Sequence, residues 1–423
     1  MRILPSFMLV FSALMCLSCP FSAQALAQEV WARFRGPNGT GMSTLKGVPT
    51  NWSDSDYEWV IDLPGKGHSS PVVWGEHLFL TSGEENGERM LICLDAFTGK
   101  QRWSTSIKLK ANHLHAKNSY GSGSPATDGE RVYVAEADPD HFIVMAHDMH
   151  GKEVWKRDLG TYQASHGFGV SPIIYQDLLI VPNDQDGPSF IEALDRQTGQ
   201  TRWKTPRKIE TASYATPIIV NLSGQDQLVA LSGATGLAGL NPLTGEELWA
   251  SGSLPQRTVA SPVYGNGLVF ATCGQAGRGV EMIAVHPVQK QISQSLIAGI
   301  RKQSMPYVPT PVIVDNYLYL WNDDGTACCV DLRGDVTKNV WRKRLGGNYS
   351  GSPVVIDGRI YCISENGDVK VIEASPEFQE YPGGKLNDPS YSTPAVANGR
   401  VYLRSFHKLA SLKSKNPLGS MQK

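Results

Sequence analysis

The sequence predicts an all-β chain that folds as an eight-bladed β-propeller of four-stranded antiparallel blades. The composition and two repeats lead to this prediction. Glycine and proline contribute 42 and 26 of the 423 residues, which favours short strands and turns over long helices. The first repeat is a Ser-Pro or Thr-Pro pair followed by a short apolar run. It occurs eight times, and the pairs begin at Ser70, Ser124, Ser171, Thr216, Ser261, Thr310, Ser352 and Thr393.

The spacing of these pairs sets the size of the repeating unit. From Ser70 to Thr393 the chain advances 323 residues in seven steps, a mean near 46. A single four-stranded sheet cannot bury both of its faces, whereas eight sheets stacked around an axis can. Units of this length that hold four strands are typical of propeller blades.

The second repeat runs in phase with the first and places a tryptophan four residues after a glycine. Three of the four glycines follow a threonine, and Asp95 and Asp195 stand four residues before their glycines. We expect each tryptophan to pack between neighbouring blades, where a large aromatic ring buries the most area. The four pairs are Gly99/Trp103, Gly151/Trp155, Gly199/Trp203 and Gly245/Trp249.

The phase of the units predicts how the ring closes. Turn pairs such as Asp128-Gly129 separate the first and second strands of a unit. The last unit, residues 393–412, has room for only three strands, and an additional strand with Trp59, residues 57–63, precedes the first unit. We therefore expect residues 57–63 to pair with residues 409–412, because an unpaired edge would otherwise remain.

The composition of the sequence separates the terminal segments of the chain from the propeller. Arg2 is the only charged residue before Glu29, an apolar run follows it, and Ala25-Leu26-Ala27 has the form of a cleavage site. The predicted order is a signal peptide (1–27), an N-terminal arm (28–56), the propeller (57–413) and a C-terminal tail (414–423). The mature chain is then periplasmic or secreted, and no later stretch is apolar enough to span a membrane.

The net charge and the cysteine content limit the partners and the kinds of site that the sequence predicts. The 39 basic and 40 acidic residues give a net charge of −1, so nucleic acid is not an expected partner. The five cysteines after residue 27 show no Cys-x-x-Cys spacing, and His113 and His115 lack an identifiable third ligand, so no metal site is predicted. Cys328 and Cys329 are expected on opposite faces of a strand, with a vicinal disulfide as the alternative.

The candidate site follows from the strand order. The loops that enter the first strand of each blade share one face and surround the mouth of the central channel. The polar and aromatic residues there form either a binding surface or a plug that satisfies its own hydrogen bonds. Trp321 and Asp323 add one short cluster at the end of a second strand. The ligand-binding candidates are His68, His166, Tyr214, Arg257, Tyr307, Trp321, Asp323, Asn348, Tyr349 and Tyr391.

The pattern Asp-x-x-Thr-Gly-x-x-x-Trp resembles the repeat of pyrroloquinoline-quinone (PQQ)-like propellers. That superfamily includes quinoprotein alcohol dehydrogenases and the non-enzymatic propeller lipoprotein of the outer-membrane barrel-assembly machine. The opening motif from Trp31 through Phe34-Arg35-Gly36-Pro37 is similar to that of secreted PQQ-like proteins of planctomycete bacteria. The resemblance covers residues 31–412.

The resemblance implies two functions. We expect a binding or scaffolding module without a cofactor, which takes a protein, small-molecule or glycan ligand at the channel mouth. The alternative is a PQQ- and calcium-dependent dehydrogenase of alcohols or sugars, in which a tryptophan stacks on the quinone and carboxylate and amide oxygens bind calcium. Trp321 with Asp323 is the one candidate for those roles, and units of 41 to 54 residues leave no room for a roof over an active site. A third possibility is a sugar- or polymer-binding surface made by the aromatic rim.

Overall fold

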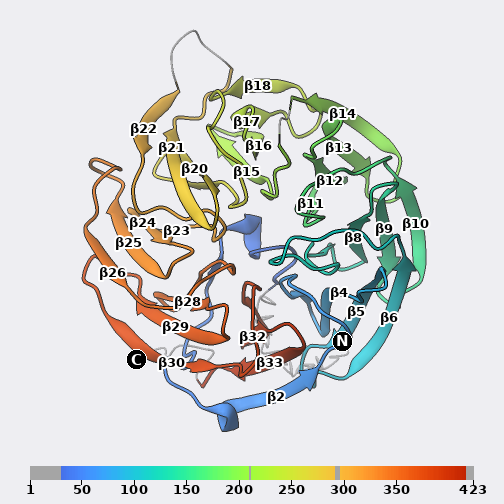
Figure 1. Cartoon of the computed structure of the whole chain (residues 1–423), viewed down its shortest axis with the longest axis horizontal. Helices are drawn as coiled ribbons and strands as arrows, with labels where there is room; N and C mark the ends of the chain where they lie inside the picture. The colour runs from blue at the N-terminus through green and yellow to red at the C-terminus, as the bar shows by residue number, and fades with distance from the viewer. Residues whose placement is uncertain (1–29, 209–210, 291–295, 416–423) are drawn as a thin grey trace, which may run out of the picture.

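The computed structural model describes residues 30–208, 211–290 and 296–415. Over these residues eight sheets, each with four antiparallel strands and one with an additional parallel strand, stand around a central axis (Figure 1), which confirms the predicted propeller. The predicted signal peptide and residues 416–423 of the predicted tail lie outside the described residues. Within the described ranges no helix is long and apolar enough to cross a membrane.

The first four blades follow one another along the chain, and each runs from its innermost to its outermost strand. Blade 1 holds β3 (Val72–Trp74), β4 (His77–Gly83), β5 (Glu88–Asp95) and β6 (Gln101–Lys108). Blade 2 holds β7 (Ala126–Thr127), β8 (Arg131–Ala137), β9 (Phe142–Asp148) and β10 (Glu153–Asp158). Blade 3 holds β11 (Ile173–Tyr175), β12 (Leu178–Asn183), β13 (Ser189–Asp195) and β14 (Thr201–Arg207). Blade 4 holds β15 (Ile218–Leu222), β16 (Gln225–Ser232), β17 (Gly236–Leu240) and β18 (Glu247–Ala250).

The second half of the ring repeats this order and also recruits the N-terminal segment. Blade 5 holds β19 (Val263–Gly265), β20 (Leu268–Gln275), β21 (Arg278–Val285) and β22 (Ile297–Arg301). Blade 6 holds β23 (Val312–Val314), β24 (Tyr317–Trp321), β25 (Thr326–Asp331) and β26 (Trp341–Arg344). Blade 7 holds β27 (Val354–Ile356), β28 (Arg359–Ile363), β29 (Asp368–Glu373) and β30 (Glu380–Lys385), with β1 (Met42–Ser43) parallel to β27. Blade 8 holds β31 (Ala395–Ala397), β32 (Arg400–Arg404), β33 (Lys408–Lys413) and, outermost, β2 (Tyr57–Asp62).

Blade 8 closes the ring as predicted. Strand β2 is antiparallel to β33, with Trp59 opposite Ser411 and Ile61 opposite Leu409. The carboxylate of Glu58 accepts two hydrogen bonds from the Arg400 guanidinium, at 2.5 and 2.8 Å. The two ends of the propeller are thus held in one sheet, side by side at the bottom of Figure 1.

The tryptophans join each blade to the next. Trp103 Nε1 donates to the carbonyl of Met149 at 2.9 Å, and a Cβ atom on Gly151 would lie 2.7 Å from the Trp103 ring. The glycine of the turn therefore makes room for the preceding blade's tryptophan. Trp155 and Trp203 repeat this contact with the turns of blades 3 and 4.

Trp249 departs from this geometry because blade 5 lacks the Thr-Gly turn. Its Nε1 donates to Gln227 Oε1 of its own blade at 2.8 Å, and its ring covers Gly239. It still packs in a cluster shared by blades 4 and 5, so the predicted position between blades is confirmed. Cys328 and Cys329 lie in two different interblade clusters and are free thiols, as expected for opposite faces of β25.

The Ser/Thr-Pro pairs stand in a ring around the axis, and hydrogen bonds join six of the eight neighbouring pairs. The backbone N–H of one pair donates to the hydroxyl of the next pair, at 2.9 to 3.0 Å. A serine or threonine suits the six accepting positions because these side chains offer a short hydroxyl acceptor. The six bonds join Ser70 to Ser124, Ser124 to Ser171, Thr216 to Ser261, Ser261 to Thr310, Thr310 to Ser352 and Ser352 to Thr393.

The N-terminal arm crosses the axis, where η1 (Pro37–Gly39) lies at the centre of the ring (Figure 1). Arg35 is fully buried and donates to five backbone carbonyls, including Thr310 O at 3.0 Å, Pro311 O at 2.8 Å and Pro353 O at 3.2 Å. Arg33 donates to Pro217 O at 2.7 Å. Burial lowers the pKa of both guanidinium groups to about 9. The arm thereby connects blades 4, 6 and 7 and obstructs the channel.

Candidate ligand-binding site at the axial mouth

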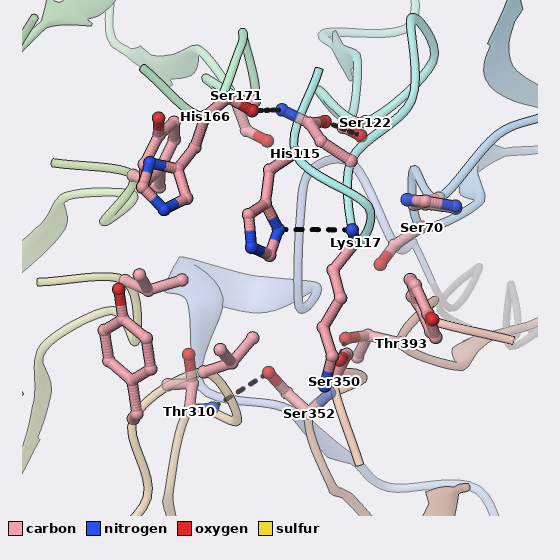
Figure 2. Close-up of a pocket in the computed structure, with 18 of the residues that line it drawn as sticks. Ser70, His115, Lys117, Ser122, His166, Ser171, Thr310, Ser350, Ser352 and Thr393 are labelled. Carbon is pink, nitrogen blue, oxygen red and sulfur yellow. Dashed lines mark hydrogen bonds between the residues drawn. The ribbon is translucent and has the colours of Figure 1, made fainter. Parts of the chain in front are cut away.

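A cavity of about 600 Å³ opens at the mouth of the channel. Its wall comes from the loops that precede the Ser/Thr-Pro pairs, and the ring hydroxyls lie deeper. Phe34 of the arm also contributes to the lining. Because Arg35 of the arm binds the carbonyls of the Thr310-Pro311 pair itself, the cavity ends at the arm. Figure 2 shows labelled side chains from several blades surrounding this space.

Five of the ten sequence candidates line the cavity together. They come from blades that are far apart in the sequence, and each lies two to five residues before its Ser/Thr-Pro pair. The five are His68, His166, Tyr214, Tyr307 and Tyr391.

The other five candidates lie outside the lining, and two of them are core residues. Trp321 is 2% exposed and Tyr349 is fully buried, with their rings edge to face at 5.3 Å in the cluster between blades 6 and 7. The expectation that they face the channel mouth is wrong, because both faces of β24 pack against neighbouring blades and Trp321 lies on the face toward blade 7. Asn348 is exposed, and its carbonyl accepts the Glu365 N–H at 2.7 Å.

Arg257 and Asp323 lie behind the lining and position residues within it. Arg257 Nη1 contacts the His166 ring, at 2.9 Å from Nε2. The Asp323 carboxylate accepts the backbone N–H groups of Tyr307 at 2.7 Å and Val308 at 3.2 Å. Burial raises the pKa of Asp323 to about 6. Its carboxylate therefore holds the loop that carries Tyr307.

Sequence reasoning missed the loop between β6 and β7, which contributes His115, Lys117, Asn118 and Ser122 to the lining. Ser70 and Ser124 are separated by 54 residues, the longest interval between pairs, and this insertion was the available signal. The His115 ring stacks on His166 with centroids 4.7 Å apart. Lys117 Nζ lies 2.5 Å from Glu365 Oε1. Among the described residues no group of three His, Cys, Asp or Glu side chains could hold a metal ion.

His68 is the most unusual group in the lining. It is 8% exposed, and its ring packs against Tyr391 and Phe406 with centroids 4.9 and 4.8 Å apart. Neither ring nitrogen has a hydrogen-bond partner among the described residues, although the ring approaches the Lys117 backbone. Burial, with the nearby charges of Lys66 and Arg404, lowers the pKa of His68 well below its usual value. The imidazole is therefore neutral at pH 7.

The donor set of the mouth does not fit calcium. Calcium in proteins takes six to eight oxygen ligands, usually with carboxylates among them. Of the described residues that line the cavity, none is Asp or Glu. Asp323 is bonded to two backbone N–H groups, and Trp321 is too buried to stack on a quinone. The residues present thus do not form the quinone and calcium site that the dehydrogenase alternative requires.

Comparison with known proteins gives the same fold and a family. A curated relative, outer membrane protein assembly factor BamB of Yersinia pestis, is 23% identical over 350 residues, which is 82% of this chain and 74% of the relative. The crystal structure of BamB from Moraxella catarrhalis has a TM-score of 0.59 at 14% identity, covering 84% of this chain and 99% of that chain. The quinohemoprotein alcohol dehydrogenase of Comamonas testosteroni has a TM-score of 0.63 at 12% identity, covering 90% of this chain and 80% of that chain.

The family model described as outer membrane protein assembly factor BamB matches residues 50–206 and 115–335. Those residues are more than half of the sequence and include blades 1 to 5 and the first three strands of blade 6. The chain therefore belongs to the PQQ-like propeller family that this model represents.

Proposed function

We propose that the protein is an exported propeller module that binds a protein partner over its axial mouth. One observation carries the proposal. Above the repeating Ser/Thr-Pro hydroxyls, the mouth gathers non-repeating polar and aromatic side chains from most of the blades at a single cavity. Side chains that vary among repeats, on loops set by a rigid ring, are suited to recognition rather than to folding.

The family supports this proposal. The curated relative is named an outer membrane protein assembly factor, and a role in assembly implies contact with other proteins. The predicted signal peptide would carry the mature chain across the inner membrane, to the side that faces the outer membrane. The dehydrogenase alternative is less well supported, because the mouth lacks the carboxylates that calcium needs.

Site-specific photo-crosslinking in the native cell envelope tests the proposal. A photoreactive residue would replace Tyr391 at the mouth, and the matched control would replace Val154, which is 43% exposed on the outermost strand β10. We expect a discrete protein adduct from position 391 and none from position 154. Adducts from position 154 alone, or a chain that stays in the cytoplasm, would contradict the proposal.

A further inference from the structure

The hydroxyl ring at the deep end of the cavity is a set of unused hydrogen-bond donors. Five hydroxyls that line the cavity each accept a backbone N–H from the preceding pair, and none of the five donates to another described residue. A hydroxyl that has accepted a hydrogen bond still has its own proton to donate. The five are Ser124, Ser171, Thr310, Ser352 and Thr393.

Three further side chains in the same lining have buried polar atoms without a well-formed hydrogen bond to a described residue: His68, Ser70 and Tyr214. The His68 ring approaches the backbone of Lys117 and the Tyr214 hydroxyl approaches that of His166, whereas Ser70 has no such neighbour within the described ranges. Burial raises the pKa of Tyr214, so its hydroxyl remains a proton donor. Buried polar groups nearly always have a partner in native proteins, so unpaired ones that face one cavity indicate a missing ligand or water. Because most of these groups donate, the missing partner is rich in acceptors.

Cationic groups near the cavity include Lys117, which lines it, and Arg257, which lies directly behind His166. Burial and the charge of Arg257 lower the pKa of His166, so this ring adds no positive charge at pH 7. The nearby carboxylates are bonded elsewhere: Asp323 accepts two backbone N–H groups, and Asp186 accepts those of Ser165 and Ala212 at 2.8 and 2.7 Å. Glu365 is the carboxylate that competes for Lys117, and it also accepts the Ser350 hydroxyl at 2.7 Å. An anion is the complementary ligand.

The size and the aromatic residues of the cavity limit the anion further. About 600 Å³ is far more than an inorganic ion fills, and lies in the range of small-molecule sites. Tyr214, Tyr307, Tyr391 and Phe34 supply apolar ring surface between the polar groups. Such a wall fits the flat face of a sugar or another ring.

From this geometry we infer that the axial mouth binds a small organic oxyanion, with its carboxylate or phosphate against the ring hydroxyls and Lys117 and its ring against the tyrosines. The inference goes beyond the proposed function: it concerns the same mouth but does not require that a protein partner binds there. It differs in naming a small molecule that binds the isolated protein. Glucuronate and glucose 6-phosphate represent the two oxyanions, and glucose is the neutral control.

Isothermal titration calorimetry of the purified mature chain tests the inference. We expect glucuronate or glucose 6-phosphate to bind at least tenfold more tightly than glucose, and more tightly than inorganic phosphate. Glu365→Gln removes the carboxylate that competes for Lys117, so it should tighten binding of the acidic sugar about fivefold and leave glucose unchanged. Lys117→Gln should weaken acid binding about fivefold, whereas Lys338→Gln, at an exposed lysine paired with Asp335, should change nothing.

The gain of affinity in Glu365→Gln separates recognition from folding, since a damaged fold does not bind more tightly. The inference is overturned if neither acid binds, if glucose binds equally well, if only inorganic phosphate binds, or if Glu365→Gln leaves the affinity unchanged. A mouth adduct in the envelope with no acid binding would overturn this inference and support the proposed function. Binding of an acidic sugar without a crosslinked adduct would support this inference and overturn the proposed function.

Discussion

The substitution Arg35→Lys tests whether the arm holds the blades together. Arg35 donates to five backbone carbonyls, and three of these belong to blades 6 and 7. Lysine keeps a cation in the same place but has at most three N–H groups, so at least two hydrogen bonds are lost. A hydrogen bond to a charged group contributes about 1.5–3 kcal/mol, so the variant should lose about 3–6 kcal/mol of unfolding free energy.

The assay is urea unfolding followed by tryptophan fluorescence, with the change read from the midpoint at constant slope. The matched control is Arg344→Lys, because Arg344 is an exposed arginine that pairs with Asp324 at 3.0 Å. Exposed ion pairs contribute roughly 0–1 kcal/mol, so this control should stay close to the parent. Equal stability of Arg35→Lys and the parent would refute the role given to the arm.

Three further predictions concern the ring, its closure and a buried acid. Thr310→Val removes the acceptor that lies 2.9 Å from the Ser261 N–H, so it should lower the unfolding free energy by about 1–3 kcal/mol. Thr310→Ser keeps a hydroxyl and should lose less. A serine variant less stable than the valine variant would contradict the hydroxyl ring. Trp59→Ala should lower the unfolding free energy, measured in urea, by about 2–3 kcal/mol, because Trp59 is half-buried against Gly99. A loss no larger than that from substituting an exposed residue would contradict the closure contact. Burial raises the pKa of Glu136 to about 8, so the folded chain binds this proton more tightly than the unfolded chain, and stability falls as pH rises from the unfolded value through 8. Glu136→Gln should therefore lose less stability than the parent between pH 6 and pH 8, by up to about 3 kcal/mol, and parallel pH profiles would contradict this assignment.

The repeating part of the fold could be predicted because its residues follow one physical rule in every blade. The turn glycine makes room for the neighbouring tryptophan, and the Ser/Thr-Pro hydroxyl accepts the neighbouring backbone N–H. These contacts recur at a fixed spacing, so they are visible in a linear sequence. The closure of β2 on β33 follows from the same spacing, since it needs only a count of strands.

The candidate site was predictable only in part, because its residues are not periodic. Counting back from the Ser/Thr-Pro pairs finds Tyr307 and Tyr391 but also selects Tyr349, which faces the core. Because the loops differ in length, side chains at the same distance in sequence from the Ser/Thr-Pro pair point in different directions. The arm that crosses the channel, and the loop that carries Lys117, have no counterpart in other units. Their positions depend on contacts between residues about 200 to 300 positions apart.

The most direct test of the account is a high-resolution crystal structure of the mature chain purified from its natural source without added ligand. The account predicts the arm across the channel, and an organic molecule in the mouth with an oxyanion group within hydrogen-bond distance of the ring hydroxyls and His68. A mouth that contains only ordered water bonded to His68 and Ser70, or a channel open from one face to the other, would contradict it.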